Sequence, residues 1–172
     1  MIATLDSREL VLDDEHIVRV RPLRSTDRAI YDRAVMDLSP RSRYFRFFAP
    51  IPRLSKRLLD QMTRIDGQRH VAYVALTLDE SSAVGVVRYV LSRDDPNEGE
   101  VAIAVDDGWQ RRGLGRQLLG QTVEHARFAG LDSLTATTLR ENRGATGLLH
   151  ASGFSAVGVS GPYAEHRVQL RH

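Results

Sequence analysis

The stretch WQRRGLGRQLL, from Trp109 to Leu119, places three arginines and two glycines where a helical pattern begins. A strand-like run, GEVAIAV (99–105), precedes it, and apolar residues at helical spacing continue from Leu114 to Ala126. Glycines let a backbone approach an anion closely, and the first N–H groups of a helix have no internal partner. The stretch therefore predicts an anion-binding loop at a helix N-terminus.

Three interpretations of this stretch compete. A polar loop with a glycine turn accounts for the glycines but not for the arginines. A dinucleotide-binding fingerprint needs a small residue where Leu118 stands and glycines directly after the strand, whereas residues 106–112 intervene. The G-x-x-x-x-G-K-[ST] phosphate-binding motif is absent. A pyrophosphate cradle explains both residue types, because backbone N–H groups, the helix dipole and arginine side chains all favour phosphate.

Composition bounds the class of protein. The chain has 172 residues, 42% of them hydrophobic and 27% charged, which predicts one domain over 1–172 with residues 1–15 as an N-terminal strand or extension. With no cysteine there is no disulfide, thiolate nucleophile or cysteine-ligated metal, and the histidines lack metal-site spacing, so no metal is expected. The N-terminus lacks a secretory pattern and no apolar run could span a bilayer, which predicts a cytoplasmic protein without a membrane partner.

The charge pattern argues against a nucleic-acid binder. The formal net charge is only +2, and Lys56 is the one lysine among 24 basic residues. Acidic and basic residues are interspersed, with no basic block of the kind that forms a nucleic-acid-binding arm.

Residue periodicity predicts an α/β protein in which helices pack on a mixed sheet. Ser25 and Ser55 are expected to be helix N-caps. The expected helices cover 25–38, 55–64, 114–130 and 142–152, with at most a short helix near 39–52. The expected strands cover 9–12, 16–22, 70–78, 83–91, 99–105, 133–139 and 154–159, with a last hairpin around Gly161-Pro162.

Two segments resemble the GNAT N-acetyltransferase superfamily. Residues 110–115 (QRRGLG) match its Q/R-x-x-G-x-G/A signature, in the expected place between a strand and a helix. Residues 139–154 (LRENRGATGLLHASGF) resemble its N-x-x-A…G-F segment, with Asn142, Ala145, Gly153 and Phe154 in register. The resemblance implies the GNAT fold, a mixed, mostly antiparallel central sheet of about six or seven strands with helices on both faces.

The first half narrows this resemblance. Residues 18–48 are similar to the start of the acetyltransferase domain in bacterial Pat-type protein lysine acetyltransferases, which show R-P-x-x-x-x-D followed by S-P-x-S-R-Y-x-R-F. The matching residues are Arg21, Pro22, Asp27, Ser39, Pro40, Ser42, Arg43, Tyr44, Arg46 and Phe47. The resemblance covers roughly residues 10–160 and implies transfer of an acetyl group from acetyl-CoA to a protein lysine.

The resemblance also implies where acetyl-CoA binds. Its pantetheine arm would pair with the strand residues Ile103, Ala104 and Val105, and a backbone N–H near Val105 would polarise the thioester carbonyl. Asn142, with Ala145, would lie on the far side of the pantetheine, although Asn142 also fits a plain helix N-cap and both roles can hold. The pyrophosphate would lie on the loop formed by Gln110, Arg111, Arg112, Gly113, Leu114, Gly115 and Arg116.

Glu100 is the candidate general base. An amine must lose a proton to react, because a free lysine has a pKa of about 10.4. Glu100 opens the strand expected beside the acyl group, and Pat-type relatives have a glutamate at the matching place; an exposed strand-end carboxylate is the alternative. Asp94, Asp95 and Glu98 form an acidic loop that either attracts a cationic amine or is simply solvated. Leu149 stands where many relatives have a tyrosine general acid.

Other functions stay open at this point. A small-molecule amine could replace the protein lysine, because acceptor pockets are set by loops outside the motifs. The absent tyrosine keeps a non-catalytic acyl-CoA sensor in view. The expected partners are acetyl-CoA and an amine acceptor, and a homodimer stays open.

Overall fold

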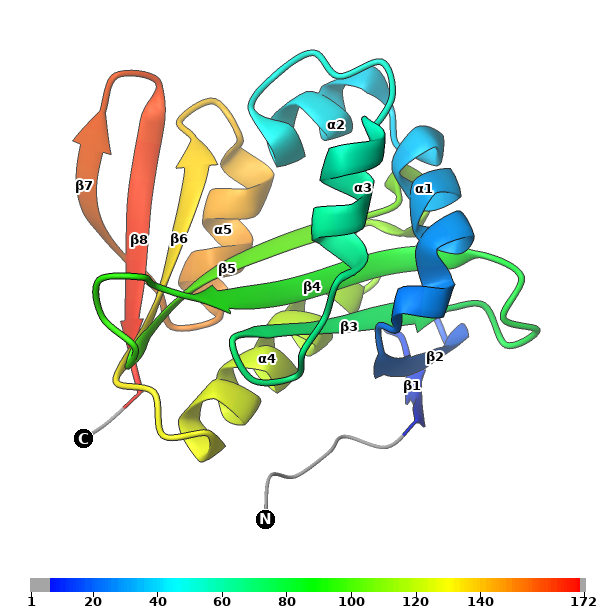
Figure 1. The fold of residues 1–172 in the computed structure, drawn as a ribbon, viewed down its shortest axis with the longest axis horizontal. Helices are drawn as coiled ribbons and strands as arrows, with labels where there is room; N and C mark the ends of the chain where they lie inside the picture. Colours follow the sequence, from blue (N-terminus) through cyan, green and yellow to red (C-terminus); the bar gives the residue numbers. More distant parts are fainter. Residues whose placement is uncertain (1–6, 171–172) are drawn as a thin grey trace.

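The central sheet has eight strands within residues 7–170, the part of the chain that the computed structural model describes. Their order across the sheet is β1-β2-β3-β4-β5-β6-β8-β7 (Figure 1). All neighbouring strands are antiparallel except β5 and β6. The strands are β1 (Arg8–Val11), β2 (Ile17–Pro22), β3 (His70–Leu76), β4 (Ala83–Leu91), β5 (Glu98–Val105), β6 (Ser133–Leu139), β7 (Ser155–Ser160) and β8 (Tyr163–Gln169).

Helices cover both faces of the sheet, as expected. In Figure 1, α1 and α3 lie in front of β3 and β4, and α4 lies behind them. The helices are α1 (Arg28–Asp37), α2 (Pro40–Phe47), α3 (Lys56–Thr63), α4 (Leu114–Phe128) and α5 (Arg143–Ala151), with short 3₁₀ turns η1 (Ser25–Asp27) and η2 (Asp107–Trp109).

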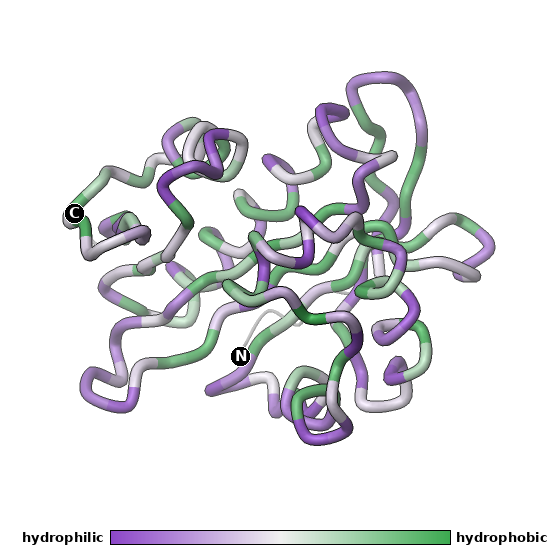
Figure 2. The backbone as a smooth tube through the Cα atoms, turned by 90° about the horizontal axis from the view of Figure 1, so that it is seen from above, coloured by the Kyte–Doolittle hydropathy of each residue, from purple (hydrophilic) through white to green (hydrophobic). Residues whose placement is uncertain are grey.

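Two apolar layers hold these helices to the sheet. On the α4 side, Leu114, Leu118 and Leu119 are almost fully buried, which confirms the helical face expected from their spacing. On the other side, Tyr31 of α1 and Leu59 of α3 pack into a second cluster. Seen from above, hydrophobic segments run through the middle of the fold and hydrophilic segments dominate the outer loops (Figure 2).

Strands β5 and β6 run side by side only where they begin. Glu98–Glu100 pair with Ser133–Thr135, after which β6 pairs with β8 and β5 stays paired with β4. The two strands therefore diverge, as Figure 1 shows. Within the described residues, the edge of Val101–Val105 that faces this gap has no neighbouring strand.

Two expectations need correction. The sheet has eight strands, more than the six or seven that the resemblance implied, because the strands expected over 9–12 and 154–159 both join it at its edges as short β1 and exposed β7. Ser25 is not a helix N-cap: it begins η1, and α1 begins only at Arg28. The carboxylate that organises this corner belongs to Asp27, which accepts hydrogen bonds from Arg21 Nη1 at 2.7 Å and Nη2 at 2.9 Å. Ser55 caps α3 as expected, by accepting from Leu58 N.

Candidate active site

The loop between η2 and α4 has the backbone that its glycines suggested. Gly113 takes a left-handed conformation with φ 81°, and Arg111 also has a positive φ of 56°. Among the described residues, the N–H groups of Arg111, Arg112 and Gly113 donate to no protein acceptor. The first N–H groups of α4 follow directly, and such groups lack partners inside a helix. This run of donors at a helix N-terminus is suited to an anion such as a pyrophosphate.

The two glycines of this loop meet different neighbours. A Cβ atom at Gly113 would lie 2.6 Å from Asp13 Oδ2, so another residue there would displace the Asp13 side chain as well as strain the backbone at φ 81°. A Cβ at Gly115 would lie 3.1 Å from Leu148 Cδ2, so Gly115 lets α4 and α5 pack closely. Sequence reasoning assigned both glycines to the anion, and the structure adds a packing reason for each.

Acidic residues of the β1–β2 turn partly neutralise the loop arginines. Arg112 Nη1 lies 2.9 Å from Asp14 Oδ2, and Arg116 Nη2 lies 3.3 Å from Asp13 Oδ1. The Asp13 N–H also donates to Arg112 O at 2.9 Å, which ties the turn to the loop backbone. Arg111 makes no ion pair within residues 7–170. The loop thus has built-in acids beside two of its three arginines.

The expected strand and helix residues flank the gap between β5 and β6. Ile103, Ala104 and Val105 are half-buried on β5, and the Gln110 amide donates to Val105 O at 3.0 Å. Asn142 is the N-cap of α5, because its Oδ1 accepts from Ala145 N at 3.1 Å. The N-cap interpretation of Asn142 is therefore confirmed; its role toward a ligand stays a prediction.

Glu100 lies where β5 and β6 begin to diverge. Its side chain is exposed, and Thr137 Oγ1 on β6 donates to its Oε1 at 3.4 Å. The acidic loop is less uniform than its sequence suggests, because Glu98 pairs with Arg167 at 2.7 Å and is held in the sheet. Leu149, at the position where the resemblance implied a tyrosine in many relatives, is 3% exposed and packs in the core.

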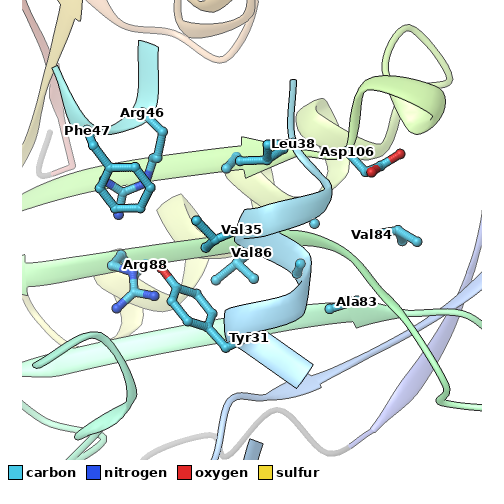
Figure 3. Close-up of a pocket in the computed structure, with 13 residues that line it drawn as sticks. Tyr31, Val35, Leu38, Arg46, Phe47, Ala83, Val84, Val86, Arg88 and Asp106 are labelled. Carbon is cyan, nitrogen blue, oxygen red and sulfur yellow. The ribbon is translucent and has the colours of Figure 1, made fainter. Parts of the chain in front are cut away.

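A pocket on the opposite sheet face from α4 was not anticipated from the sequence (Figure 3). It lies between α1, α2 and the paired strands β4 and β5. Its lining residues are Tyr31, Ala34, Val35, Leu38, Arg46, Phe47, Ala83, Val84, Gly85, Val86, Arg88, Ala104 and Asp106. Because it combines apolar walls with two arginines, we call it the arginine pocket.

Arg88 is the most unusual side chain of the arginine pocket. It is 4% exposed, lies 5.3 Å from the Tyr31 ring centroid, and its Nη1 donates to Met62 O at 2.7 Å and to His70 Nε2 at 2.9 Å. Its Nη2 is buried without a hydrogen-bond partner among the described residues. Burial lowers the pKa of Arg88 to about 10, and the positive charge of Arg46 acts in the same direction. The guanidinium therefore remains charged at neutral pH.

Asp107 fixes α2 above the sheet. Its carboxylate accepts from Ser39 N and Ser39 Oγ, both at 3.0 Å, and from Ser42 Oγ at 2.7 Å. Ser39 is also the N-cap of α2, so these bonds join the helix start to η2, just before the glycine loop. The Ser-Pro-x-Ser segment noted in the sequence thus places Arg46 and Phe47, near the other end of α2, on the arginine pocket.

Sequence reasoning missed Arg88, although one signal was available. In the strand AVGVVRYVL, Arg88 interrupts a run that is otherwise apolar on both faces, where an arginine needs partners. Asp13 and Asp107 gave no comparable signal, because their partners lie far along the chain.

The described residues also bear on a metal site and on a membrane span. They contain no group of three histidine, aspartate or glutamate side chains placed to hold a metal ion. None of their helices combines the length and apolar character needed to span a bilayer.

Comparisons with known proteins agree with this geometry. The sequence profile of the acetyltransferase (GNAT) family matches residues 34–154. Acetyltransferase PA5475 of Pseudomonas aeruginosa is 34% identical over 145 residues, 83% of this chain and 77% of that protein. Acetyltransferase Pat of Mycolicibacterium smegmatis is 26% identical over 98 residues, 57% of this chain but only 29% of that protein. The solved GNAT domain of S. lividans PAT superposes with a TM-score of 0.89 at 26% identity, covering 95% of this chain and 96% of that domain.

Proposed function

This chain belongs to the acetyltransferase (GNAT) family, and we propose that it moves an acetyl group from acetyl-CoA to a primary amine by direct transfer in a ternary complex. The family implies an acyl-CoA co-substrate and an amine acceptor. The observation that supports this proposal most is the free edge of β5 at Val101–Val105, which begins beside Glu100 and leads to the N-terminus of α4.

The residues present fit acetyl-CoA. Main-chain groups of Ile103–Val105 on the free edge can pair with the amides of the pantetheine arm, as an added strand would. The unpartnered N–H groups of Arg111–Gly113 and the start of α4 suit its pyrophosphate. Arg111 adds a positive charge that no built-in acid neutralises among the described residues.

Glu100 is the proposed general base. The incoming ammonium loses a proton to its carboxylate, directly or through one water, and the neutral amine attacks the thioester carbon. A C–N bond forms, the C–S bond breaks, and coenzyme A leaves as its thiolate. The hydrogen bond from Thr137 across the strand gap holds the carboxylate at the point of divergence. Because Leu149 offers no acidic proton, the thiolate takes its proton from water.

The acceptor has two candidate classes. A protein lysine is the acceptor suggested by the resemblance to Pat-type enzymes. The arginine pocket favours instead a small amine that also carries an anionic group. A recess with a buried, incompletely bonded guanidinium suits such a molecule better than it suits a protein surface.

Calorimetric titration with acetyl-CoA, with NADH as the control ligand, tests the co-substrate. We expect saturable one-to-one binding of acetyl-CoA alone. Arg111→Gln should weaken it by about fivefold through loss of one phosphate contact, whereas Arg93→Gln, an exposed arginine in the β4–β5 hairpin, should not. Thiol release is then measured with a lysine peptide, polyamines and free amino acids. Binding without thiol release for any amine would instead support the acyl-CoA sensor.

A further inference from the structure

Two guanidinium groups share the arginine pocket without an acid between them. Figure 3 shows Arg46 and Phe47 from α2 above Arg88 from β4, with Asp106 at the other end of the pocket. No ion pair within residues 7–170 includes Arg46 or Arg88. The Asp106 carboxylate instead accepts from Gly108 N at 2.9 Å. Two like charges in a partly apolar recess are unfavourable unless an anion joins them.

The surroundings of Arg88 leave one bonding direction unused. Arginine only donates, so His70 Nε2 must be an acceptor, and Met62 O takes the second bond from Nη1. Burial lowers the pKa of His70 to about 4, and the Arg88 charge reinforces that direction, so this histidine is neutral and supplies no counter-charge. The buried Nη2 of Arg88 has no hydrogen-bond partner in the described part of the chain. The missing group is therefore an acceptor, and a negatively charged one satisfies the guanidinium best.

We propose that the acceptor is a small amino acid whose carboxylate binds Arg88 and Arg46 in the arginine pocket while its amine faces Glu100. This proposal rests on the proposed acetyl transfer and names its substrate class. Tyr31, Phe47 and Val35 then form the apolar walls beside the carboxylate and the side chain of the acceptor.

The sheet register supports this placement. Arg88 pairs with Ala102 and Val90 pairs with Glu100, so Arg88 and Glu100 are diagonal neighbours on the same face of β4 and β5. Such neighbours have Cα atoms about 7–8 Å apart, and both side chains are long enough to approach one small molecule. The same face of β5 presents Ala102 and Ala104, whose small side chains leave space between the two ends.

Burial favours a free small molecule over a protein acceptor. Arg88 is 4% exposed and lies beneath α1 and α2, so an acidic side chain on a protein surface would have to enter a recess between two helices. A free amino acid has no such constraint. Arg46 is only half-buried on α2, and it is suited to close over the carboxylate from the solvent side.

The test measures kcat/KM for each of the twenty amino acids and for their amides and decarboxylated amines, which keep the amine but lose the charge. For at least one amino acid, we expect kcat/KM to exceed that of its amide and its decarboxylated amine by about tenfold or more. In Arg46→Gln that ratio should fall by about tenfold, as one charge-assisted bond is lost. Arg41→Gln is the matched control, because Arg41 is exposed on the same helix and stacks on Phe45 outside the pocket.

Arg88→Lys provides a second variant with a smaller risk of misfolding than a neutral substitution. It retains the charge but loses the planar fork, so the preference for the acid should shrink while the melting temperature shows whether the fold survives. An equal preference for acid and amide, or a preference that Arg46→Gln leaves unchanged, would overturn the proposal. Acetylation of a lysine peptide with no free amino acid accepted would also overturn it, yet would leave the proposed acetyl transfer intact.

A failure of acetyl transfer itself gives a different pattern. If thiol release from acetyl-CoA is seen with no amine, calorimetric titration of the wild type with the same amino acids tests the pocket assignment separately. Binding of an acid that is weakened by Arg46→Gln supports the pocket assignment without catalysis. Absence of binding by every amino acid refutes it.

Discussion

The glycine loop (residues 110–116) and the arginine pocket both gather arginines, but they neutralise them differently. In the loop, Arg112 and Arg116 lie beside Asp14 and Asp13 of the β1–β2 turn. In the pocket, Arg46 and Arg88 have no acidic partner among the described residues, and one Arg88 nitrogen is unbonded. Arg111 and Arg116 of the loop are exposed and Arg112 is half-buried, whereas Arg88 is buried.

This difference distinguishes two ways in which a protein can bind an anion, through backbone N–H groups or through guanidinium groups. The loop offers backbone donors and a helix N-terminus, so its arginines need only add to a field that already favours phosphate. In the pocket, the unpartnered donor among the described residues is a side-chain atom, Arg88 Nη2, so we expect the guanidinium groups to make the contact themselves. We therefore expect charge changes in the loop to have small effects and charge changes in the pocket to have large ones.

The largest effect should come from Glu100, which lies near Arg88 on the same face of β4 and β5. Glu100→Gln removes the proposed base and should lower kcat by about 10²–10⁴, with acetyl-CoA affinity unchanged. Steady-state rates and calorimetry on the same preparation measure both quantities. Loss of affinity with normal turnover of the bound co-substrate would show that Glu100 serves binding, and the two regions would then lack a common base.

A third arrangement, the pair of Arg21 and Asp27, sharpens the comparison because its acid is built in and buried. Burial alone would raise the pKa of Asp27, but hydrogen bonds from Arg21 and the Arg24 N–H outweigh it and lower the pKa. Asp27→Asn removes the bidentate partner of Arg21 and leaves only Glu80, whose Oε2 lies 3.7 Å from Arg21 Nε. The change should cost about 2 kcal/mol, below the value for a fully interior pair. Urea unfolding measures this loss. In the wild type the contribution is present above the unfolded pKa and is lost as the pH falls through the lower folded pKa.

His70 tests whether the pocket tolerates another positive charge. Its pKa is about 4 in the folded protein against an ordinary 6.5, so the unfolded chain binds the proton more readily between these values. Stability from this group is complete above pH 6.5 and is lost as the pH falls toward 4. Melting temperatures across that range should fall more steeply for wild type than for His70→Gln. Parallel curves would mean that burial and the Arg88 charge do not lower the pKa of His70 in the folded protein.

The smallest effect should come from removing an acidic partner from a loop arginine, so that it lacks an ion pair as the pocket arginines do. Asp14→Asn frees Arg112 from its ion pair, and acetyl-CoA affinity should rise by about two- to fivefold, with a steeper dependence on salt. Titrations at low and high salt give both values. Weaker binding in Asp14→Asn would indicate that this acid positions Arg112 for the phosphate, and the contrast between the two regions would then be smaller.

Local sequence determined much of this protein. Apolar spacing placed the strands and helices, and the serine before α3 was correctly expected to be its cap, because these features depend on neighbours within a few residues. The glycines and arginines of 110–116 and the Asn142 segment indicated the family for the same reason, since each motif is contiguous. Ser25 failed as a cap because Asp27, bound to Arg21 on β2, organises that corner instead.

Only the tertiary structure decided which charges are neutralised. Asp13 meets Arg116, which lies 103 positions further along the chain, and Ser39 meets Asp107, which lies 68 positions further along. Arg88 could be noticed in its apolar strand, but its partners Met62 and His70 come from α3 and β3. Periodicity records which face of an element is apolar. It does not record which distant charge will face that element, because chain folding alone brings the two together.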